Sequence, residues 1–221
     1  MNVFDAIRKR HSTRAFLNKD VAIENVTRIL DIARYSPSGA NTQPWQVAVV
    51  SGESKIKLQT ALEKAYSSGL KSQISYKYYP VTWKPVYKKR RHLCGLQLYQ
   101  SLNINRSDSE ARKAQWAANY RAFDAPVMLL FFIDKEMETG SFLDYGMFLQ
   151  SIMLAAMEEG LATCPQAALA EYPQIVKQIL GYGDEINLIC GMALGYEDHN
   201  AEVNKYRTPR ETIANFTQYF D

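Results

Sequence analysis

The stretch Val127-Met128-Leu129-Leu130-Phe131-Phe132-Ile133 decides the fold, because it is the longest unbroken apolar run in the chain. It follows Ala125-Pro126, and a short apolar run after such a boundary is typical of a buried strand. A transmembrane helix needs about 20 apolar residues, so this run is too short to span a bilayer. We therefore expect residues 127–133 to form the central strand of a soluble protein.

Strands and helices are predicted on both sides of this run. Residues 46–50 and 186–195 have the β-branched and apolar composition of two further strands. The helix expected over residues 143–157 is apolar around most of its surface, which a subunit interface would satisfy, and Gly160 is placed to end it. Other helices are expected near residues 22–35, 58–65, 86–102, 108–121 and 211–220. Strands separated by helices predict a layered fold with a mixed sheet, in one domain over residues 1–221.

Composition and charge exclude several functional classes. Of the 221 residues, 47% are hydrophobic, as in a globular protein, and the net charge of +3 does not indicate nucleic-acid binding. The N-terminus carries charges where a signal peptide would need an apolar segment. The 3 cysteines form no CxxC pair, and the 3 histidines form no cluster at metal-ligand spacing. We expect a cytoplasmic protein in a reducing compartment, with no disulfide framework, no metal, no nucleic-acid partner and no membrane association.

Two basic clusters stand at opposite ends of the chain. Arg10, Ser12 and Arg14 alternate, so in an extended segment they face the same way, and guanidinium groups match phosphate oxygens bidentately. Arg207 and Arg210 form the second cluster and could converge on the same anion. An alternating polar segment is also typical of a solvated edge, so the residues alone leave both interpretations open.

Two segments of small residues could bring backbone groups close to a ligand. They are the loop Ser36–Trp45, where Asn41 adds an amide, and the segment Thr163–Ala170. A helix-to-strand turn and tight packing need the same residue types, so a purely structural role is equally open. The chain has no GxGxxG, GxxxxGK[ST] or GxSxG motif and no nucleophile beside a base, which favours chemistry borrowed from a cofactor.

Residues 67–86 show no core pattern but are crowded with aromatic side chains, among them Tyr76, Tyr79 and Trp83. A long irregular segment of this kind forms either a lid over a site or an arm that packs on a partner. The basic run at residues 84–91 is either a solvated helix face or a contact for an anionic ligand such as a pyridine-nucleotide phosphate.

Five segments together resemble the FMN-dependent nitroreductase family and, within it, the branch of nitrobenzoate reductases. They are RHSTR at 10–14, SPSGANTQPW at 36–45, GLATCPQAA at 160–168, CGMALGY at 190–196 and VNKYRTPR at 203–210. They occur in family order over nearly the whole chain. The resemblance implies an α+β fold with a central sheet flanked by helices, in an intertwined homodimer with two FMN sites at the subunit interface.

The resemblance also implies which residues bind FMN. The first segment would contact the phosphate and ribityl groups, with Arg207 or Arg210 completing the anion site. The loop Pro37–Asn41 would come from the partner subunit, and Gln166–Ala168 would present backbone groups to the ring. The implied set is Arg10, His11, Ser12, Arg14, Pro37, Ser38, Gly39, Asn41, Pro165, Gln166, Ala167, Ala168, Arg207 and Arg210. We expect a substrate lid from Tyr76, Tyr79 and Trp83, and no catalytic side chain, because FMN carries the chemistry.

The activity implied by the resemblance is NAD(P)H-dependent reduction of nitroaromatic or quinone-like compounds. It would follow a ping-pong cycle with hydride transfer through the flavin N5 atom. A reductive dehalogenase or an enone reductase on the same fold is the alternative, and a non-catalytic flavin-binding protein is a further one. If the protein is an enzyme, either a nitroreductase or one of the alternative enzymes, we expect its substrate to be a small aromatic compound.

Overall fold

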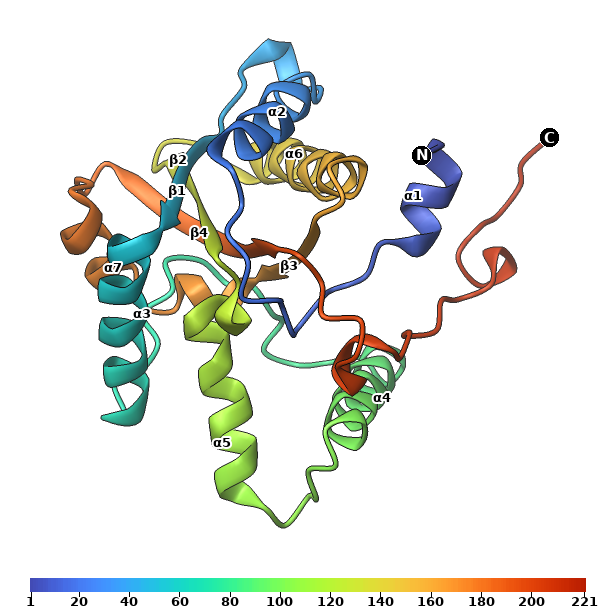
Figure 1. The fold of residues 1–221 in the computed structure, drawn as a ribbon. Helices are drawn as coiled ribbons and strands as arrows, with labels where there is room; N and C mark the ends of the chain where they lie inside the picture. Colours follow the sequence, from blue (N-terminus) through green and yellow to red (C-terminus); the bar gives the residue numbers. More distant parts are fainter.

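A four-stranded sheet runs through the computed structural model, which describes residues 1–221 (Figure 1). Its strands are β1 (Gln46–Ser51), β2 (Val127–Asp134), β3 (Ala162–Gln166) and β4 (Ile186–Gly195), in the order β1-β2-β4-β3. The apolar run lies in β2, an interior strand that is buried up to its last residue, so the predicted central strand is confirmed. The other two predicted strands are confirmed as β1 and β4.

The sheet is antiparallel at each pairing, so the expected mixed sheet is wrong. That expectation assumed that strands separated by helices run parallel to their neighbours. Strands β2 and β3 do run in the same direction and are joined through a helix, but β4 lies between them and pairs antiparallel with both. Because β4 lies between the two parallel strands and runs in the opposite direction, both of the pairs that it forms are antiparallel.

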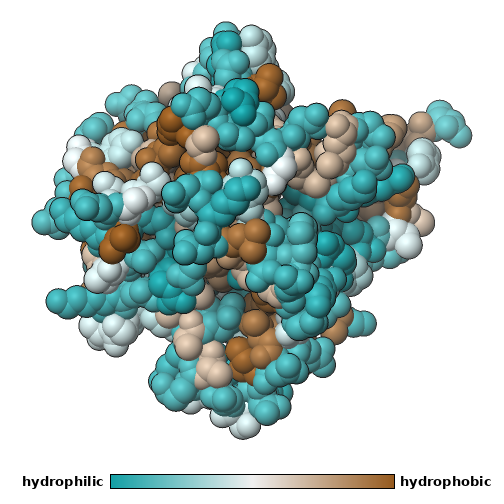
Figure 2. All heavy atoms as spheres, in the orientation of Figure 1, coloured by the Kyte–Doolittle hydropathy of each residue, from teal (hydrophilic) through white to brown (hydrophobic).

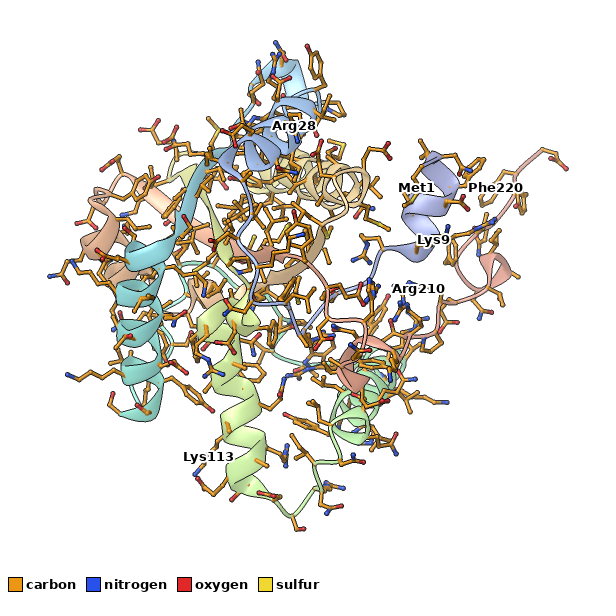
Figure 3. The ribbon with its side chains drawn as sticks, in the orientation of Figure 1. Met1, Lys9, Arg28, Lys113, Arg210 and Phe220 are labelled. Atoms are coloured by element: carbon orange, nitrogen blue, oxygen red, sulfur yellow. The ribbon has the colours of Figure 1, made fainter.

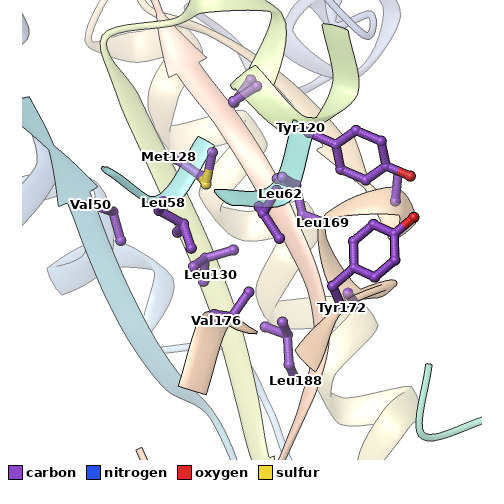
Figure 4. Close-up of a cluster of buried hydrophobic side chains, with 14 of the residues drawn as sticks. Val50, Leu58, Leu62, Tyr120, Met128, Leu130, Leu169, Tyr172, Val176 and Leu188 are labelled. Carbon is purple, nitrogen blue, oxygen red and sulfur yellow. The ribbon is translucent and has the colours of Figure 1, made fainter. Parts of the chain in front are cut away.

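Alternate residues of β2 enter two hydrophobic clusters. Met128, Leu130 and Phe132 belong to the first cluster, which Figure 4 shows. Leu129 and Phe131 belong to the second. Successive side chains of a strand point to opposite faces, so this one strand contributes to the core on both sides of the sheet. Burying each such side chain stabilises the fold by roughly 1.5–3 kcal/mol relative to leaving it exposed.

Helices cover both faces of the sheet (Figure 1). The face of the first cluster is covered by α3 (Gly52–Ser67) and α7 (Pro173–Leu180). The other face is covered by α2 (Ile23–Ala33) and α6 (Thr139–Glu158). Just beyond α6, Gly160 has a φ of 69°, the left-handed conformation expected where this helix ends.

Two helices stand off the sheet. They are α4 (Pro85–Ser101) and α5 (Ser109–Ala117), neither of which has a buried residue, and they diverge like the arms of a V (Figure 1). Helix α1 (Val3–Lys9) and the C-terminal segment 211–221 lie on one side of the molecule, away from the sheet (Figure 1). None of the helices combines the length with the apolar composition that a bilayer crossing requires. Five 3₁₀ helices occur, at Gly39–Asn41, Ala118–Asp124, Ala167–Ala170, Glu202–Asn204 and Ile213–Asn215.

Some elements differ from the sequence-based expectations. Strand β3 was not predicted, because it is short and contains Pro165, and only its pairing with β4 identifies it. The helix expected near residues 211–220 is wrong, since the segment forms only the 3₁₀ turn Ile213–Asn215. None of its residues is buried, and a helix this short is marginal without packing. Between α3 and α4 the aromatic segment contains no helix or strand, as expected.

Candidate functional site

The two basic clusters from opposite ends of the chain line one cavity of about 570 Å³, which we call the arginine cavity. Its arginines are Arg8, Arg10 and Arg14 from the N-terminal segment and Arg207 and Arg210 from the C-terminal segment. Figure 3 shows Arg210 next to the end of α1 that Lys9 marks. The remaining lining residues are Ile7, His11, Ser12, Cys94, Val203, Tyr206 and Thr208.

Hydrogen bonds hold the two segments next to each other. The N–H of Thr13 donates to the carbonyl oxygen of Thr163 at 3.0 Å, which ties the N-terminal segment to β3. The N–H of Arg14 donates to Oδ1 of Asn204 at 2.8 Å, and Nδ2 of Asn204 donates to the carbonyl oxygen of Ala15 at 2.8 Å. Sequence reasoning did not single out Asn204, because its burial is visible only in the tertiary structure.

The charges in the arginine cavity are not compensated by protein groups. None of its five arginines forms a salt bridge. Nη1 of Arg10 lies 3.8 Å from Sδ of Met153, and Nη1 of Arg14 donates to the carbonyl oxygen of Ser12 at 3.2 Å. Burial, followed by the positive charge of Arg210, lowers the pKa of Arg10. Like charges without a counter-charge suit an anion such as a phosphate.

The two C-terminal arginines donate only to neutral oxygen atoms of their own segment. Nη1 of Arg207 donates to the carbonyl oxygen of Asn204 at 2.6 Å, and Nη1 of Arg210 donates to Oγ1 of Thr208 at 2.7 Å. Neither guanidinium group is therefore paired with a carboxylate.

His11 lines the arginine cavity, but its ring is engaged elsewhere. Nε2 of His11 lies 3.0 Å from Oε1 of Glu197, and Nδ1 lies 3.2 Å from the carbonyl oxygen of Lys9. With both ring nitrogens in contact with protein oxygens, the imidazole is not free to contact an anion.

The segment Pro165–Ala168 lies at the end of β3, and the same strand bridges Ser12 through Thr163. Within it, Gln166 and Ala168 are buried. Nε2 of Gln166 donates to the carbonyl oxygen of Asn119 at 3.0 Å, whereas its Oε1 is buried without a hydrogen-bond partner. Because buried polar atoms are nearly always paired, this free acceptor suits a hydrogen-bond donor of a ligand.

The loop Pro37–Asn41 does not line the arginine cavity. The N–H of Gly39 donates to Oδ2 of Asp144 on α6 at 3.1 Å, which attaches the loop to the opposite side of the sheet from the first cluster. Ala40 and Asn41 have φ values of 48° and 58°, a left-handed backbone that is uncommon outside glycine and is found at many functional sites. Within one chain, the structure therefore does not bring this loop together with the arginines.

The aromatic segment is anchored to the sheet at one residue. The hydroxyl of Tyr76 donates to the carbonyl oxygen of Ile189 on β4, and its ring centroid lies 5.5 Å from that of Phe142. Burial raises the pKa of Tyr76. The ring centroids of Tyr79 and Trp83 are 5.4 Å apart. These contacts order the three residues predicted as a lid.

A second cavity, of about 590 Å³, lies between residues 72–79 and Ala167, and we call it the aromatic cavity. Tyr76 and Tyr79 line it, whereas Trp83 does not. Ala167, one residue of the segment predicted to face a flavin ring, and two of the residues predicted as a lid therefore border the same space.

Neither buried cysteine has the features of a nucleophile, and the third cysteine, Cys94, is an exposed free thiol that lines the arginine cavity. Burial raises the pKa of the Cys164 thiol, and it raises the pKa of the Cys190 thiol to about 12, so both stay protonated at neutral pH. No group of three or more His, Cys, Asp or Glu residues is gathered in a way that could hold a metal ion.

Comparison with known proteins gives relatives over nearly the full length. The profile described as "Nitroreductase family" matches residues 7–196. A 4-nitrobenzoate reductase of Pseudomonas putida is 38% identical over 98% of this chain and 95% of its own length. The FMN and NADPH-dependent nitroreductase NfnB of Sphingopyxis sp. strain HMH is 38% identical, with a TM-score of 0.97 over 100% of both chains. The FMN-dependent NfnB of Mycobacterium smegmatis, solved in complex with NADPH, is 31% identical, with a TM-score of 0.94 over 99% of this chain and 97% of that one.

Proposed function

The chain belongs to the nitroreductase family, and we propose that it is an FMN-dependent enzyme that uses NADPH to reduce aromatic nitro compounds. The observation that carries this proposal is the arginine cavity, where cationic groups from both ends of the chain converge without a carboxylate partner. FMN ends in a phosphate, and the guanidinium fork matches phosphate geometry. Relatives of nearly equal length are named as nitrobenzoate and chloronitrobenzene reductases.

The residues of this chain fit FMN. Arg10, Ser12 and Arg14 would hold the phosphate and the ribityl chain, with Arg207 or Arg210 completing the anion site. The unpaired Oε1 of Gln166 and the backbone of Ala167 and Ala168 would border the ring. When bound, FMN supplies two-electron transfer between NADPH and the nitro group.

The chain's own residues bind, orient and shield the reactants. The arginines would hold the anionic end of the cofactor, and β3 runs from that end to Gln166, where the 3₁₀ helix that begins at Ala167 borders the aromatic cavity. Tyr76 and Tyr79 line that cavity and would provide apolar ring surface for an aromatic substrate and exclude water. Cys164 and Cys190 are buried and protonated, so neither would act as a nucleophile, and the cofactor would supply the chemistry.

We infer that the functional unit is a homodimer in which the loop Pro37–Asn41 completes the arginine cavity of the partner. Large apolar side chains are exposed on α1 and on the C-terminal segment 211–221. Phe4 is 75% exposed, Phe216 71% and Phe220 87%. Elsewhere, the face in Figure 2 is mostly hydrophilic with small separate apolar groups. A partner subunit would cover such apolar segments. Light scattering of the 25.2-kDa chain should give about twice this mass, and a monomeric mass would contradict the inference.

A cytoplasmic location is part of the same proposal. All three cysteines are free thiols, which is the usual state in a reducing compartment. NADPH as the electron donor fits that setting.

The test is direct. The purified protein should show a flavin absorption band, lose it when NADPH is added without oxygen, and regain it when 4-nitrobenzoate is added. Failure to bind added FMN would overturn the proposal. Retained FMN that NADPH does not reduce would favour a non-catalytic flavin-binding protein, and faster turnover of a halophenol than of the nitro compound would favour the dehalogenase.

A further inference from the structure

A third cavity, of about 460 Å³, lies between α4 and α5, and we call it the α4–α5 cleft. In Figure 1 the two helices are joined by a loop and diverge from it. Lys88, Arg91 and His92 line it from α4, Arg112 lines it from α5, and Arg106 lines it from the connecting loop. No acidic residue lines the cleft.

The positive charge of the cleft is uncompensated. Lys88, Arg91, Arg106 and Arg112 form no salt bridge. Neighbouring cations on the same helices behave differently, since Arg90 pairs with Glu211 at 2.9 Å and Lys113 pairs with Glu110 at 2.9 Å. The available carboxylates therefore neutralise cations outside the cleft and leave those inside it free.

This charge pattern has no structural explanation within the chain. Lys88, Arg91 and His92 are at i, i+3 and i+4, so they share one face of α4, where the like charges of Lys88 and Arg91 destabilise the helix. Helix α4 has no buried residue, so core packing does not require that face. An anionic ligand would offset the repulsion.

Aromatic rings hold two of the guanidinium groups in place. Arg112 lies 5.2 Å above the ring of Tyr99, which also lines the cleft. Arg91 lies 5.2 Å from both the Tyr79 and the Trp83 ring centroids. Stacking of this kind uses the faces of the guanidinium planes and leaves their edges for hydrogen bonds. At Arg112 one such bond is made within the chain, from Nη1 to the carbonyl oxygen of Arg106 at 3.3 Å.

The cleft adjoins the aromatic cavity through one contact. Tyr79 lines the aromatic cavity beside Ala167, and the same ring stacks on Arg91 of the cleft. A ligand of sufficient length can therefore place one end near Ala167 and its anionic end in the cleft.

We propose that the α4–α5 cleft binds the 2′-phosphate of the adenosine end of NADPH and so selects NADPH over NADH. The inference rests on the proposed function. A phosphate monoester carries a charge of about −1.5 to −2 at neutral pH, which matches a cationic cleft without acids. Tyr99 and Leu96 provide apolar surface for a heterocycle beside it. NADH lacks this phosphate, so its binding gains nothing from the cleft.

The binding test uses the FMN-loaded protein and calorimetric titration with adenosine 2′,5′-bisphosphate, adenosine 5′-monophosphate and inorganic phosphate. We expect the bisphosphate to bind roughly tenfold or more tightly than either other probe. The advantage should shrink with added salt. Equal affinity for the bisphosphate and the 5′-monophosphate would overturn the proposal, and equal affinity for inorganic phosphate would reduce the cleft to a general anion site.

Two variants test the named residues. Arg91→Gln and Arg112→Gln should each weaken bisphosphate binding roughly tenfold. They should also lower kcat/KM for NADPH more than kcat/KM for NADH. Both residues are exposed, so neither change removes core packing. The matched control is Lys113→Gln, since Lys113 is on α5 but on the side turned away from α4 (Figure 3).

Different results would overturn the role of the α4–α5 cleft and the proposed function of the protein. A protein that reduces 4-nitrobenzoate but keeps its NADPH-to-NADH preference in both arginine variants would overturn only the role of the cleft. A protein that reduces no nitro compound with either nucleotide would overturn the proposed function, while the bisphosphate titration would still show whether the cleft recognises the phosphate.

Discussion

The N–H of Arg14 donates to Oδ1 of Asn204 at 2.8 Å, and this bond joins the two ends of the chain at the arginine cavity. Nδ2 of the same buried side chain donates to the carbonyl oxygens of Ala15 at 2.8 Å and Asp198 at 2.9 Å. One side chain thus satisfies three backbone groups and sets the position of the arginines on either side of it.

Asn204→Ala should lower both stability and FMN affinity, because it leaves buried backbone groups unpaired. We expect a loss of about 1–3 kcal/mol in the free energy of unfolding of the apoprotein, measured by urea titration. The FMN dissociation constant should rise. Asn215→Ala, which removes an exposed amide that donates to Glu211, is the control. An unchanged FMN affinity in Asn204→Ala would restrict Asn204 to a structural role.

Arg10→Ala should weaken FMN binding by about 1.5–3 kcal/mol, the range for a hydrogen bond to a charged group. Arg10 is partly buried and has no carboxylate partner, so its removal costs no salt bridge. Flavin fluorescence titration of the apoprotein measures the change. Arg28→Ala is the control, since Arg28 lies on α2, far from Arg210 (Figure 3), and pairs with Glu159 at the end of α6. If both variants bind FMN equally well, Arg10 does not contact the phosphate.

Gln166→Leu should weaken FMN binding roughly tenfold, because it keeps the side-chain volume but removes the buried unpaired acceptor. Gln97 on α4 carries the other buried Oε1 without a partner, so Gln97→Leu is a matched control that should leave FMN affinity unchanged. Thermal melting of both apoproteins separates binding from stability. Equal FMN affinity in the two variants would show that Gln166 does not face the ligand.

Tyr76→Phe should raise KM for 4-nitrobenzoate without changing FMN affinity. The variant keeps the ring against Phe142 but loses the hydrogen bond to Ile189 that anchors the aromatic segment. Amide hydrogen exchange should become faster over residues 72–79. Tyr78→Phe is the control, because Tyr78 lies in the same segment but its hydroxyl makes no hydrogen bond to the protein. Unchanged exchange and unchanged KM would argue against a lid.

The buried Cys190 thiol predicts a loss of stability at alkaline pH. Burial raises its pKa to about 12 from an ordinary value of 9.0, so the unfolded chain releases this proton first. The free energy of unfolding should therefore fall as pH rises from about 9 to about 12, by at most about 1.4 kcal/mol per pH unit from this group. Cys190→Ala should show a shallower decline in urea titrations, with Cys94→Ala, an exposed thiol, as the control. Identical slopes would contradict the assignment, and turnover at pH 7 should survive the change.

Local patterns in the sequence predicted the elements whose formation depends on neighbouring residues. The apolar run 127–133 predicted a buried central strand, and it is β2. The helical stripe before Gly160 became α6, which ends where that glycine adopts a positive φ. The five motifs were sufficient to identify the family, because their residue types and order persist along the whole chain.

The tertiary structure decided how the strands pair and whether the C-terminal segment becomes a helix. The direction of the strands depends on β4 entering between β2 and β3, and no local pattern records that choice. The C-terminal segment has helical spacing but lacks a surface to pack on, so it remains extended apart from one turn.

The candidate site, too, was determined in part by the sequence and in part by the tertiary structure. The sequence by itself determined that Arg10, Arg14, Arg207 and Arg210 are cations suited to a phosphate, because that property belongs to the side chain. Only the fold decided that they share one cavity and that His11 faces Glu197. Charge belongs to single residues, whereas distance and burial arise from contacts between segments far apart in the chain.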